Sequence, residues 1–167
     1  MAHATAVEDF LDRHHLAHEL VSHAPTGSSL ESARAARIPP ERVAKGVLLS
    51  AGGKYLLAVT RADCQLNLDE LRRQLRAEVE LATQEDLDTV FNDCSLGAVP
   101  PLGPAYGIES VWDDELMKEP DLYFEFGDHT HLVHVRTRDY LALLDADRHG
   151  SFSEPRIPSS LGLWGTA

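Results

Sequence analysis

Two β-hairpins stand out in the pattern of apolar and polar positions along the chain. Residues 43–50 and 54–60 are rich in Val, Leu and Tyr, and Ala51-Gly52-Gly53 supplies a turn between them. In residues 121–126 apolar side chains alternate with polar ones, and residues 130–135 follow after a Gly-Asp turn. Strands that are joined by short turns pair antiparallel.

Helices are expected between these strands. Ser28 with Glu31 three residues later is the pattern of a capping box, and the helix that it opens, to about Arg37, ends before Pro39-Pro40 because proline removes an amide donor. The other expected elements are helices over residues 6–14, 68–76, 83–91 and 138–145 and short strands over residues 18–22, 78–82 and 108–112. This alternation predicts an α+β fold with a mixed, mainly antiparallel sheet.

The length and composition of the chain fit a single compact domain. Its 167 residues are 43% hydrophobic and 25% charged, which is typical of a globular protein. We expect the domain to cover residues 1–146, and residues 147–167, which are rich in Pro, Ser and Gly, to form a loose tail. No apolar run reaches the roughly 18 residues of a membrane span, and the N-terminus has no apolar signal segment. A cytoplasmic protein without membrane contact is therefore expected.

The charge is distributed unevenly. The formal net charge is −12, and residues 63–128 alone carry 17 acidic and 4 basic side chains. This argues against DNA binding and against a wide electrostatic grip on any nucleic acid. Four cations lie between residues 34 and 45, and they are Arg34, Arg37, Arg42 and Lys45. A phosphate-binding site would lie in this segment, although the cations also fit a solvated set of helix-end charges.

Several common catalytic signatures are missing from the sequence. It contains no GxSxG, HExxH, GxGxxG or GxxxxGK[ST] motif. Cys64 and Cys94 are too few and too far apart for a disulfide framework or a CxxC metal site. His129 and His131 would share one face of a strand, whereas His134 would point to the other. We therefore expect neither a metal nor another cofactor.

Two features suggest chemistry nevertheless. Lys45 would share a strand face with Val43 and Val47, so its ammonium either extends to solvent or faces a cleft where it meets an anion. Residues 97–104 contain three prolines and two glycines. Such a rigid loop can direct peptide N–H groups at a carbonyl oxygen, although it also fits a plain connection between a helix and a strand.

The ordered set of these features resembles the YbaK/EbsC family of aminoacyl-tRNA deacylases, which is related to the editing domain of bacterial prolyl-tRNA synthetase. The resemblance extends over about residues 5–146. Its anchors are His23, Ile38-Pro-Pro-Glu-Arg-Val-Ala-Lys45, Tyr55-Leu-Leu-Ala-Val-Thr60, Asn67-Leu-Asp-Glu-Leu71, the GxxxP motif Gly97-Ala-Val-Pro-Pro101 with Gly103 after it, and Gly127-Asp128-His129.

The resemblance implies a compact α+β domain around a curved mixed sheet, and hydrolysis of the ester between a wrong amino acid and the 3′-terminal adenosine of tRNA. It implies that Lys45 meets the adenosine or its phosphate and that the backbone of Gly97 borders the scissile carbonyl. His23, Arg42, Pro101 and His129 are the expected substrate-binding residues. The expected partners are the acceptor end of mischarged tRNA and, in some settings, an aminoacyl-tRNA synthetase.

Two other functions remain compatible with the sequence. A non-catalytic module could bind aminoacyl-tRNA or a synthetase through the same cleft, and an esterase could act on a small aminoacyl or nucleotide ester. The sequence leaves open which amino acid is removed. Two amino acids that differ by one methylene differ in binding by only about 1–3 kcal/mol, so small changes in the pocket decide the choice. Small residues such as alanine, serine or cysteine, on tRNA for proline or another amino acid, fit the resemblance.

Overall fold

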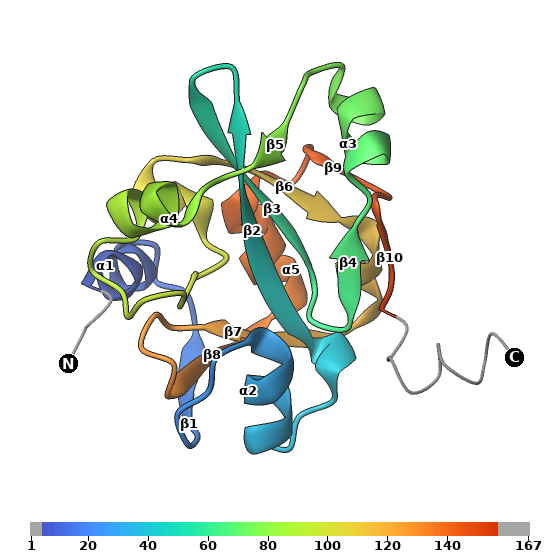
Figure 1. The fold of residues 1–167 in the computed structure, drawn as a ribbon. Helices are drawn as coiled ribbons and strands as arrows, with labels where there is room; N and C mark the ends of the chain where they lie inside the picture. The colour runs from blue at the N-terminus through green and yellow to red at the C-terminus, as the bar shows by residue number, and fades with distance from the viewer. Residues whose placement is uncertain (1–4, 157–167) are drawn as a thin grey trace, which may run out of the picture.

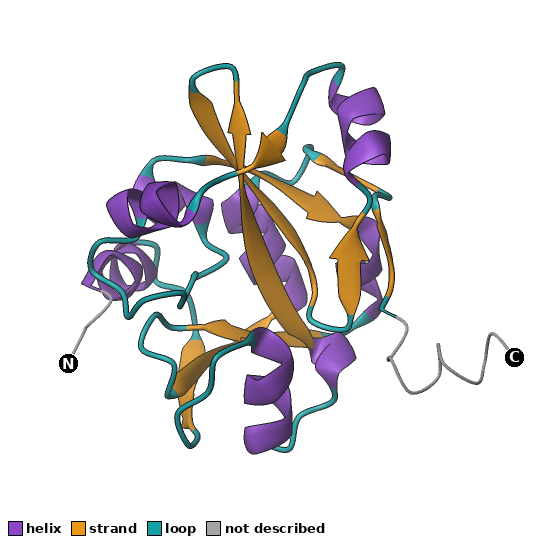
Figure 2. Ribbon diagram, in the orientation of Figure 1, coloured by secondary structure: helices purple, strands orange, loops and turns teal. Residues whose placement is uncertain are grey.

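The computed structural model describes residues 5–156 and shows a mixed sheet with helices on both of its faces (Figures 1 and 2). The helices are α1 (Thr5–Arg13), α2 (Ser29–Ala35), α3 (Leu68–Leu75), α4 (Gln84–Val90) and α5 (Thr137–Leu144), with short 3₁₀ helices η1 (Pro40–Arg42), η2 (Gly103–Tyr106) and η3 (Asp114–Lys118). The strands are β1 (His18–Ser22), β2 (Val43–Ala51), β3 (Lys54–Arg61), β4 (Cys64–Leu66), β5 (Glu80–Leu81), β6 (Glu109–Asp113), β7 (Asp121–Glu125), β8 (His131–Arg136), β9 (His149–Gly150) and β10 (Ser153–Pro155).

The main sheet has eight strands and confirms the expected α+β class. Its order is β1-β8-β7-β2-β3-β6-β9, with β5 paired to β2, and a second sheet joins β10 to β4. The two expected hairpins are present as β2–β3 and β7–β8, both antiparallel. The β2–β7, β3–β6 and β6–β9 pairs are parallel, which makes the sheet mixed. Among the described residues, none of the helices has the length and apolar character needed to cross a membrane.

Local sequence signals explain where the elements begin and turn. Gly52 and Gly53 have φ angles of 56° and 86°, which glycine adopts without the steric cost that other residues meet in a two-residue hairpin turn. The Ser28 hydroxyl caps α2 by accepting the Glu31 N–H at 3.1 Å. The Glu31 carboxylate accepts the Gly27 N–H instead of the Ser28 N–H, so only half of the expected capping box forms.

The core lies on both faces of the sheet. On one face, α1 and α5 pack against a large apolar cluster that includes Phe10, Phe124 and Tyr140. On the other face, Leu71 of α3 packs with Ala58 of β3 and neighbouring apolar side chains. Side chains alternate along β2 and β3, so each strand contributes to both clusters.

Residues 147–156 are part of the packed domain, and the expectation of a loose tail is wrong for this stretch. Strand β9 pairs with β6, and β10 pairs with β4. Phe152 between them is only 1% exposed, and its N–H donates to the Asp113 carboxylate at 2.9 Å. A buried aromatic ring holds this segment down despite its Ser- and Pro-rich composition. The rest of the expected tail, residues 157–167, lies outside the described residues.

The sheet is split along one edge of β2. Strand β7 pairs with β2 only at Val43 and Ala44, and β5 pairs with it only at Leu49 and Ser50. Within residues 5–156, no strand therefore pairs with residues 45–48 on the edge that faces away from β3. The proline-rich loop between α4 and η2 reaches β2 at this gap.

Candidate active site

Pro101 of the proline-rich loop packs directly on β2 at the gap in the sheet. A Cβ built on Gly46 would lie 3.2 Å from the Pro101 Cα, so the missing side chain of Gly46 permits this close approach. The buried Tyr140 hydroxyl of α5 donates a hydrogen bond to the Pro101 carbonyl oxygen. The C-terminal end of the GxxxP motif is thus fixed from two sides.

Gly97, at the start of the motif, has a left-handed φ of 78°. Two hydrogen bonds hold the loop on either side of it. The Ser95 N–H donates to the Gly127 carbonyl at 2.8 Å, and the Ala98 N–H donates to the Ser95 carbonyl at 2.9 Å. The Gly97 N–H has no acceptor within residues 5–156. This leaves a fixed peptide N–H that is free to bind an oxygen atom of a ligand.

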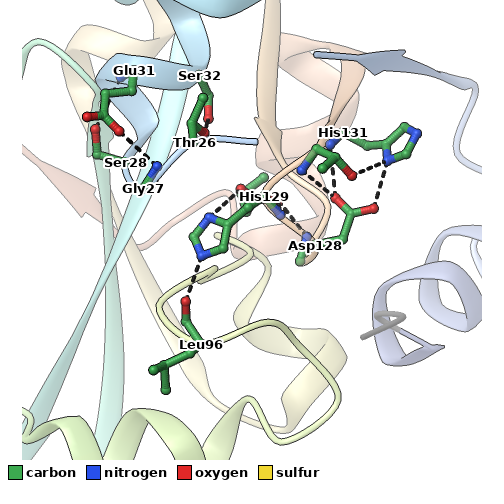
Figure 3. A network of polar contacts seen from close by, with 12 residues as sticks. Thr26, Gly27, Ser28, Glu31, Ser32, Leu96, Asp128, His129 and His131 are labelled. Atoms are coloured by element: carbon green, nitrogen blue, oxygen red, sulfur yellow. Dashed lines mark hydrogen bonds and ion pairs between the residues drawn. The ribbon is translucent and has the colours of Figure 1, made fainter. Parts of the chain in front are cut away.

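The His129 ring holds the loop at Leu96, the residue before Gly97, and Figure 3 shows this contact. Its Nε2 lies 2.6 Å from the Leu96 carbonyl oxygen, and because a carbonyl only accepts, Nε2 carries the hydrogen. The same Nε2 lies 3.9 Å from the position of a Cβ on Gly97. The backbone carbonyl of His129 accepts the Thr26 N–H at 3.2 Å, which ties this turn to the segment before α2.

Glu125 supports this turn from inside the protein, and the sequence analysis missed it. One carboxylate oxygen, Oε2, accepts the N–H of Gly127 at 2.8 Å and that of His129 at 3.3 Å. The other, Oε1, lies 3.8 Å from Nδ1 of His129. Burial raises the pKa of Glu125, and the backbone N–H of Gly127 acts in the opposite direction. Its only signal in the sequence is a carboxylate between two phenylalanines, Phe124 and Phe126, at the end of a strand.

His23 lies beside the same turn. Its N–H donates to the carbonyl of Thr130, the residue after His129, at 2.8 Å. Its Nδ1 donates to the Ala24 carbonyl at 2.7 Å, which leaves Nε2 as an acceptor. Nε2 is buried and has no hydrogen-bond partner among the described residues. The structure thus gathers three of the expected site residues, His23, Gly97 and His129, around one turn.

His131 and His134, the two histidines that follow His129, have partners of their own. His131 Nδ1 lies 2.7 Å from Asp128 Oδ2, which Figure 3 also shows, and His134 Nε2 lies 2.5 Å from Asp121 Oδ2. The His134 ring stacks on Tyr123 with the ring centroids 4.1 Å apart. No group of three or more His, Cys, Asp or Glu side chains within residues 5–156 has the arrangement of a metal site.

Lys45 lies on β2 directly before Gly46, with its side chain on the opposite face from Pro101, because side chains alternate along a strand. Helix α2 packs on this same face, through the contact between Ala33 and Val43. Partial burial of the ammonium lowers the pKa of Lys45, the nearby Arg156 guanidinium lowers it further, and the Asp63 carboxylate acts in the opposite direction.

Lys45 is exceptional among the partly buried cations. Each of the others within residues 5–156 forms an ion pair with a carboxylate, and these are Arg42, Arg61, Arg72 and Arg148. Lys45 has no such partner in this part of the chain. Its nearest carboxylate, Asp63, is already paired with Arg61, and a partly desolvated ammonium without an ion pair of its own favours the binding of an anion.

Arg42 occupies a different environment from the one expected. Its Nε lies 3.2 Å from Glu119, and its Nη1 lies 3.4 Å from Asp121. Two carboxylates thus already balance its charge, and no contact joins it to Gly97 or His129. The sequence suggested a shared site because Arg42 and Lys45 are only three positions apart.

Neither cysteine provides a nucleophile at neutral pH. Burial raises the pKa of the Cys64 thiol to about 11 and that of the Cys94 thiol to about 12. Thiolates are the nucleophilic form, so both side chains are unreactive thiols near pH 7. Neither thiol therefore supplies an attacking group at this site.

Comparison with known proteins identifies the family of the chain. The family model of the aminoacyl-tRNA editing domain matches residues 23–143. The chain is 33% identical over 78 residues to the proline--tRNA ligases of Geobacillus thermodenitrificans (strain NG80-2) and Geobacillus kaustophilus (strain HTA426). Each match includes 46% of this chain and 14% of the ligase, so the chain corresponds to a small part of the length of these relatives.

Two crystal structures share the fold. One is that of a proposed trans-editing enzyme for prolyl-tRNA synthetase, with a TM-score of 0.76 and 21% identity over 90% of this chain and 96% of that chain. The other is that of a hypothetical protein, with a TM-score of 0.77 and 21% identity over 89% of this chain and 99% of that chain. Because the family model covers most of the chain, the protein belongs to the aminoacyl-tRNA editing domain family, and the resemblance noted in the sequence is confirmed.

Proposed function

We propose that this protein is a deacylase that hydrolyses tRNA for proline carrying a small, wrong amino acid, and that Lys45, Gly97, His23 and His129 form its site. The observation that carries this proposal is that one strand, β2, holds the partly buried ammonium of Lys45, which has no ion pair within residues 5–156, and also contacts the loop whose Gly97 N–H is free. The link to tRNA for proline rests on the similarity to the two proline--tRNA ligases.

In this proposal Lys45 binds the phosphate that precedes the terminal adenosine. A phosphate supplies the negative charge that Lys45 lacks within the protein, and the partial desolvation of the ammonium strengthens this contact. Arg42 has no part in it, because Glu119 and Asp121 already neutralise its charge. The substrate would cross the unpaired edge of β2, from Lys45 on one face to Gly97 at the gap.

Gly97 is proposed to stabilise the transition state. Its N–H would donate to the ester carbonyl oxygen as negative charge develops on that oxygen during attack by water. The carbon–oxygen bond to the ribose then breaks, and the released ribose oxygen takes up a proton. The neighbouring ribose hydroxyl can relay this proton, so the substrate supplies part of the machinery.

His23 and His129 are proposed to border the amino-acid side of the site. The buried Nε2 of His23 is an acceptor for the α-ammonium or a hydroxyl of the substrate. The His129 ring, held by Leu96, limits the room beside Gly97. A restricted space of this kind favours small aminoacyl groups, since a side chain that is too large would collide with fixed atoms.

The test is deacylation of tRNA for proline charged with alanine, serine, cysteine or proline. We expect at least one small amino acid to be released faster than proline. Lys45→Ala removes the proposed phosphate contact and should lower kcat/KM by about 10²-fold. Gly97→Ala keeps the N–H but strains a backbone with a φ of 78°, so it should displace this donor and also lower the rate. Lys54→Ala, which removes an exposed lysine from the hairpin turn, is the matched control and should keep the wild-type rate.

Three results would contradict the proposal. Folded Lys45→Ala and Gly97→Ala variants with wild-type rates would exclude these residues from the site. Binding of aminoacyl-tRNA without any hydrolysis would favour a non-catalytic module. Equal rates on aminoacyl-adenosine and on full tRNA would favour a small-ester esterase. Addition of prolyl-tRNA synthetase to the same assay tests whether a synthetase partner raises the rate.

A further inference from the structure

We propose that Arg156 joins Lys45 in a two-cation site that holds a phosphate group of the tRNA acceptor strand, so that the C-terminal segment of the domain takes part in substrate binding. This inference rests on the proposed function of Lys45. It concerns a residue outside residues 23–143, the part of the chain that matches the family model.

The path of β10 brings Arg156 to the face of the sheet on which Lys45 lies. Lys45 pairs with Thr60 of β3 across the hairpin, and the Thr60 and Ser153 hydroxyl oxygens are 2.5 Å apart. Ser153 begins β10, which therefore passes over the strand position next to Lys45. The Arg156 N–H then donates to the Asp63 carbonyl at 2.9 Å, which anchors its backbone at the end of β3.

The charges around this point leave both cations without a counter-ion. Asp63 is the nearest carboxylate along this path, and its two oxygens accept Nε and Nη2 of Arg61 at 2.8 Å and 2.5 Å. Neither Lys45 nor Arg156 forms an ion pair within residues 5–156. Burial lowers the pKa of Lys45 first and repulsion by Arg156 lowers it second, whereas the weaker attraction by Asp63 acts in the opposite direction. An anion placed between them would relieve this repulsion.

A phosphodiester fits this pair better than a carboxylate does. The carboxyl group of the amino acid is esterified in the substrate, so the negative charge nearest to the scissile bond belongs to the phosphate before the terminal adenosine. Lysine contributes a compact point charge, and arginine adds a planar fork that bonds two phosphate oxygens. The remainder of the chain is strongly acidic, with a net charge of −12, so this local positive site would direct the acceptor end to one position.

The experiment compares wild type with Arg156→Gln, and with Arg138→Gln as a matched control. Arg138 is also an exposed arginine, but it lies on α5, on the opposite side of the sheet. Steady-state hydrolysis is measured between about 50 and 200 mM salt. For Arg156→Gln we expect KM to rise about tenfold, kcat to stay within about twofold, and the slope of log(kcat/KM) against log[salt] to become shallower by about 0.7 to 1. Arg156→Lys should restore most of the loss, and Arg138→Gln should match wild type.

Binding of a non-hydrolysable analogue, with an amide in place of the ester, separates this inference from the proposed function. If wild type hydrolyses no aminoacyl-tRNA, the proposed function fails, yet weaker binding by Arg156→Gln with a shallower salt slope would still support the two-cation site. An Arg156→Gln variant with wild-type affinity and slope would overturn the inference. So would weaker binding with an unchanged slope, because that result indicates a structural effect and not a lost phosphate contact.

Discussion

Gly46 and Pro101 approach each other so closely that a Cβ on Gly46 would lie 3.2 Å from the Pro101 Cα. The contact joins the strand that carries Lys45 to the loop that carries Gly97. A displacement of Gly46 or Pro101 would therefore change the distance between Lys45 and Gly97.

Gly46→Ala is expected to damage activity more than stability. The new methyl group would push Pro101 and Leu57 by a few tenths of an ångström, and overpacking of this kind costs about 1–3 kcal/mol. Because misplaced catalytic groups lose rate steeply, we expect kcat/KM to fall by about tenfold or more. Deacylation kinetics and urea unfolding on the same sample measure both effects. Full activity with an unchanged midpoint of urea unfolding would show that the position of the loop does not depend on this contact.

Tyr140→Phe tests the second anchor of the loop. The substitution removes the hydroxyl that donates to the Pro101 carbonyl while it keeps the buried ring. A buried acceptor left without a donor costs about 1–3 kcal/mol, which should appear as a lower free energy of unfolding. We also expect a lower kcat with little change in KM, since the loop stays present but less fixed. A variant as stable as wild type would argue that water replaces the hydroxyl.

Phe152→Ala tests whether residues 147–156 belong to the domain. The ring is 1% exposed and packs with the cluster around Leu71 and Ala58. Truncation of a buried phenylalanine costs about 3–5 kcal/mol, so the denaturant midpoint should drop sharply. Leu96→Ala, at a 72% exposed side chain, serves as the control for stability and should leave the midpoint nearly unchanged. If Phe152→Ala lowered the free energy of unfolding by less than about 1 kcal/mol, residues 147–156 would contribute little to the stability of the domain.

The lowered pKa of Lys45 predicts a pH dependence of binding. Burial and then Arg156 bring its pKa below the ordinary 10.5, so the ammonium loses its proton at a lower pH than an exposed lysine does. Affinity for the amide analogue should therefore be full near neutral pH and decline as the pH rises through the lowered pKa. Arg156→Gln removes one cause of the shift and should move this decline to higher pH. Isothermal titration calorimetry from pH 7 to 10.5 measures this affinity. If Lys45→Gln shows the same decline as wild type, the decline belongs to another titrating group.

The sequence alone determined the local elements of this protein. The caps at Ser28, Asn67 and Thr83 and the glycine pair in the first hairpin act within a few residues, so their structural consequences follow from neighbours in the chain. The same holds for the alternation in β7 and for the α+β class. The family resemblance, carried by the ordered motifs from His23 to His129, was also present in the sequence, and the match over residues 23–143 confirms it.

Tertiary structure decided which charged groups are neutralised. Arg42 and Lys45 are three residues apart and look alike in the sequence, but Arg42 meets Glu119 and Asp121 from a distant segment, whereas Lys45 meets no carboxylate within the described residues. The energy of a cation depends on the charges and the solvent around it, and these come from residues far away in the chain.

Tertiary structure also decided which residues support the site. Glu125 is one polar residue of an alternating strand in the sequence, and only the fold brings the Gly127 and His129 amides to its carboxylate. The segment at residues 147–156 has the composition of a tail, yet the pocket for Phe152 exists only once α3 and β3 have packed. Local propensity acts over a few residues, whereas burial, close contact and charge balance are properties of the assembled fold, and for this reason the sequence could place the motifs but not their surroundings.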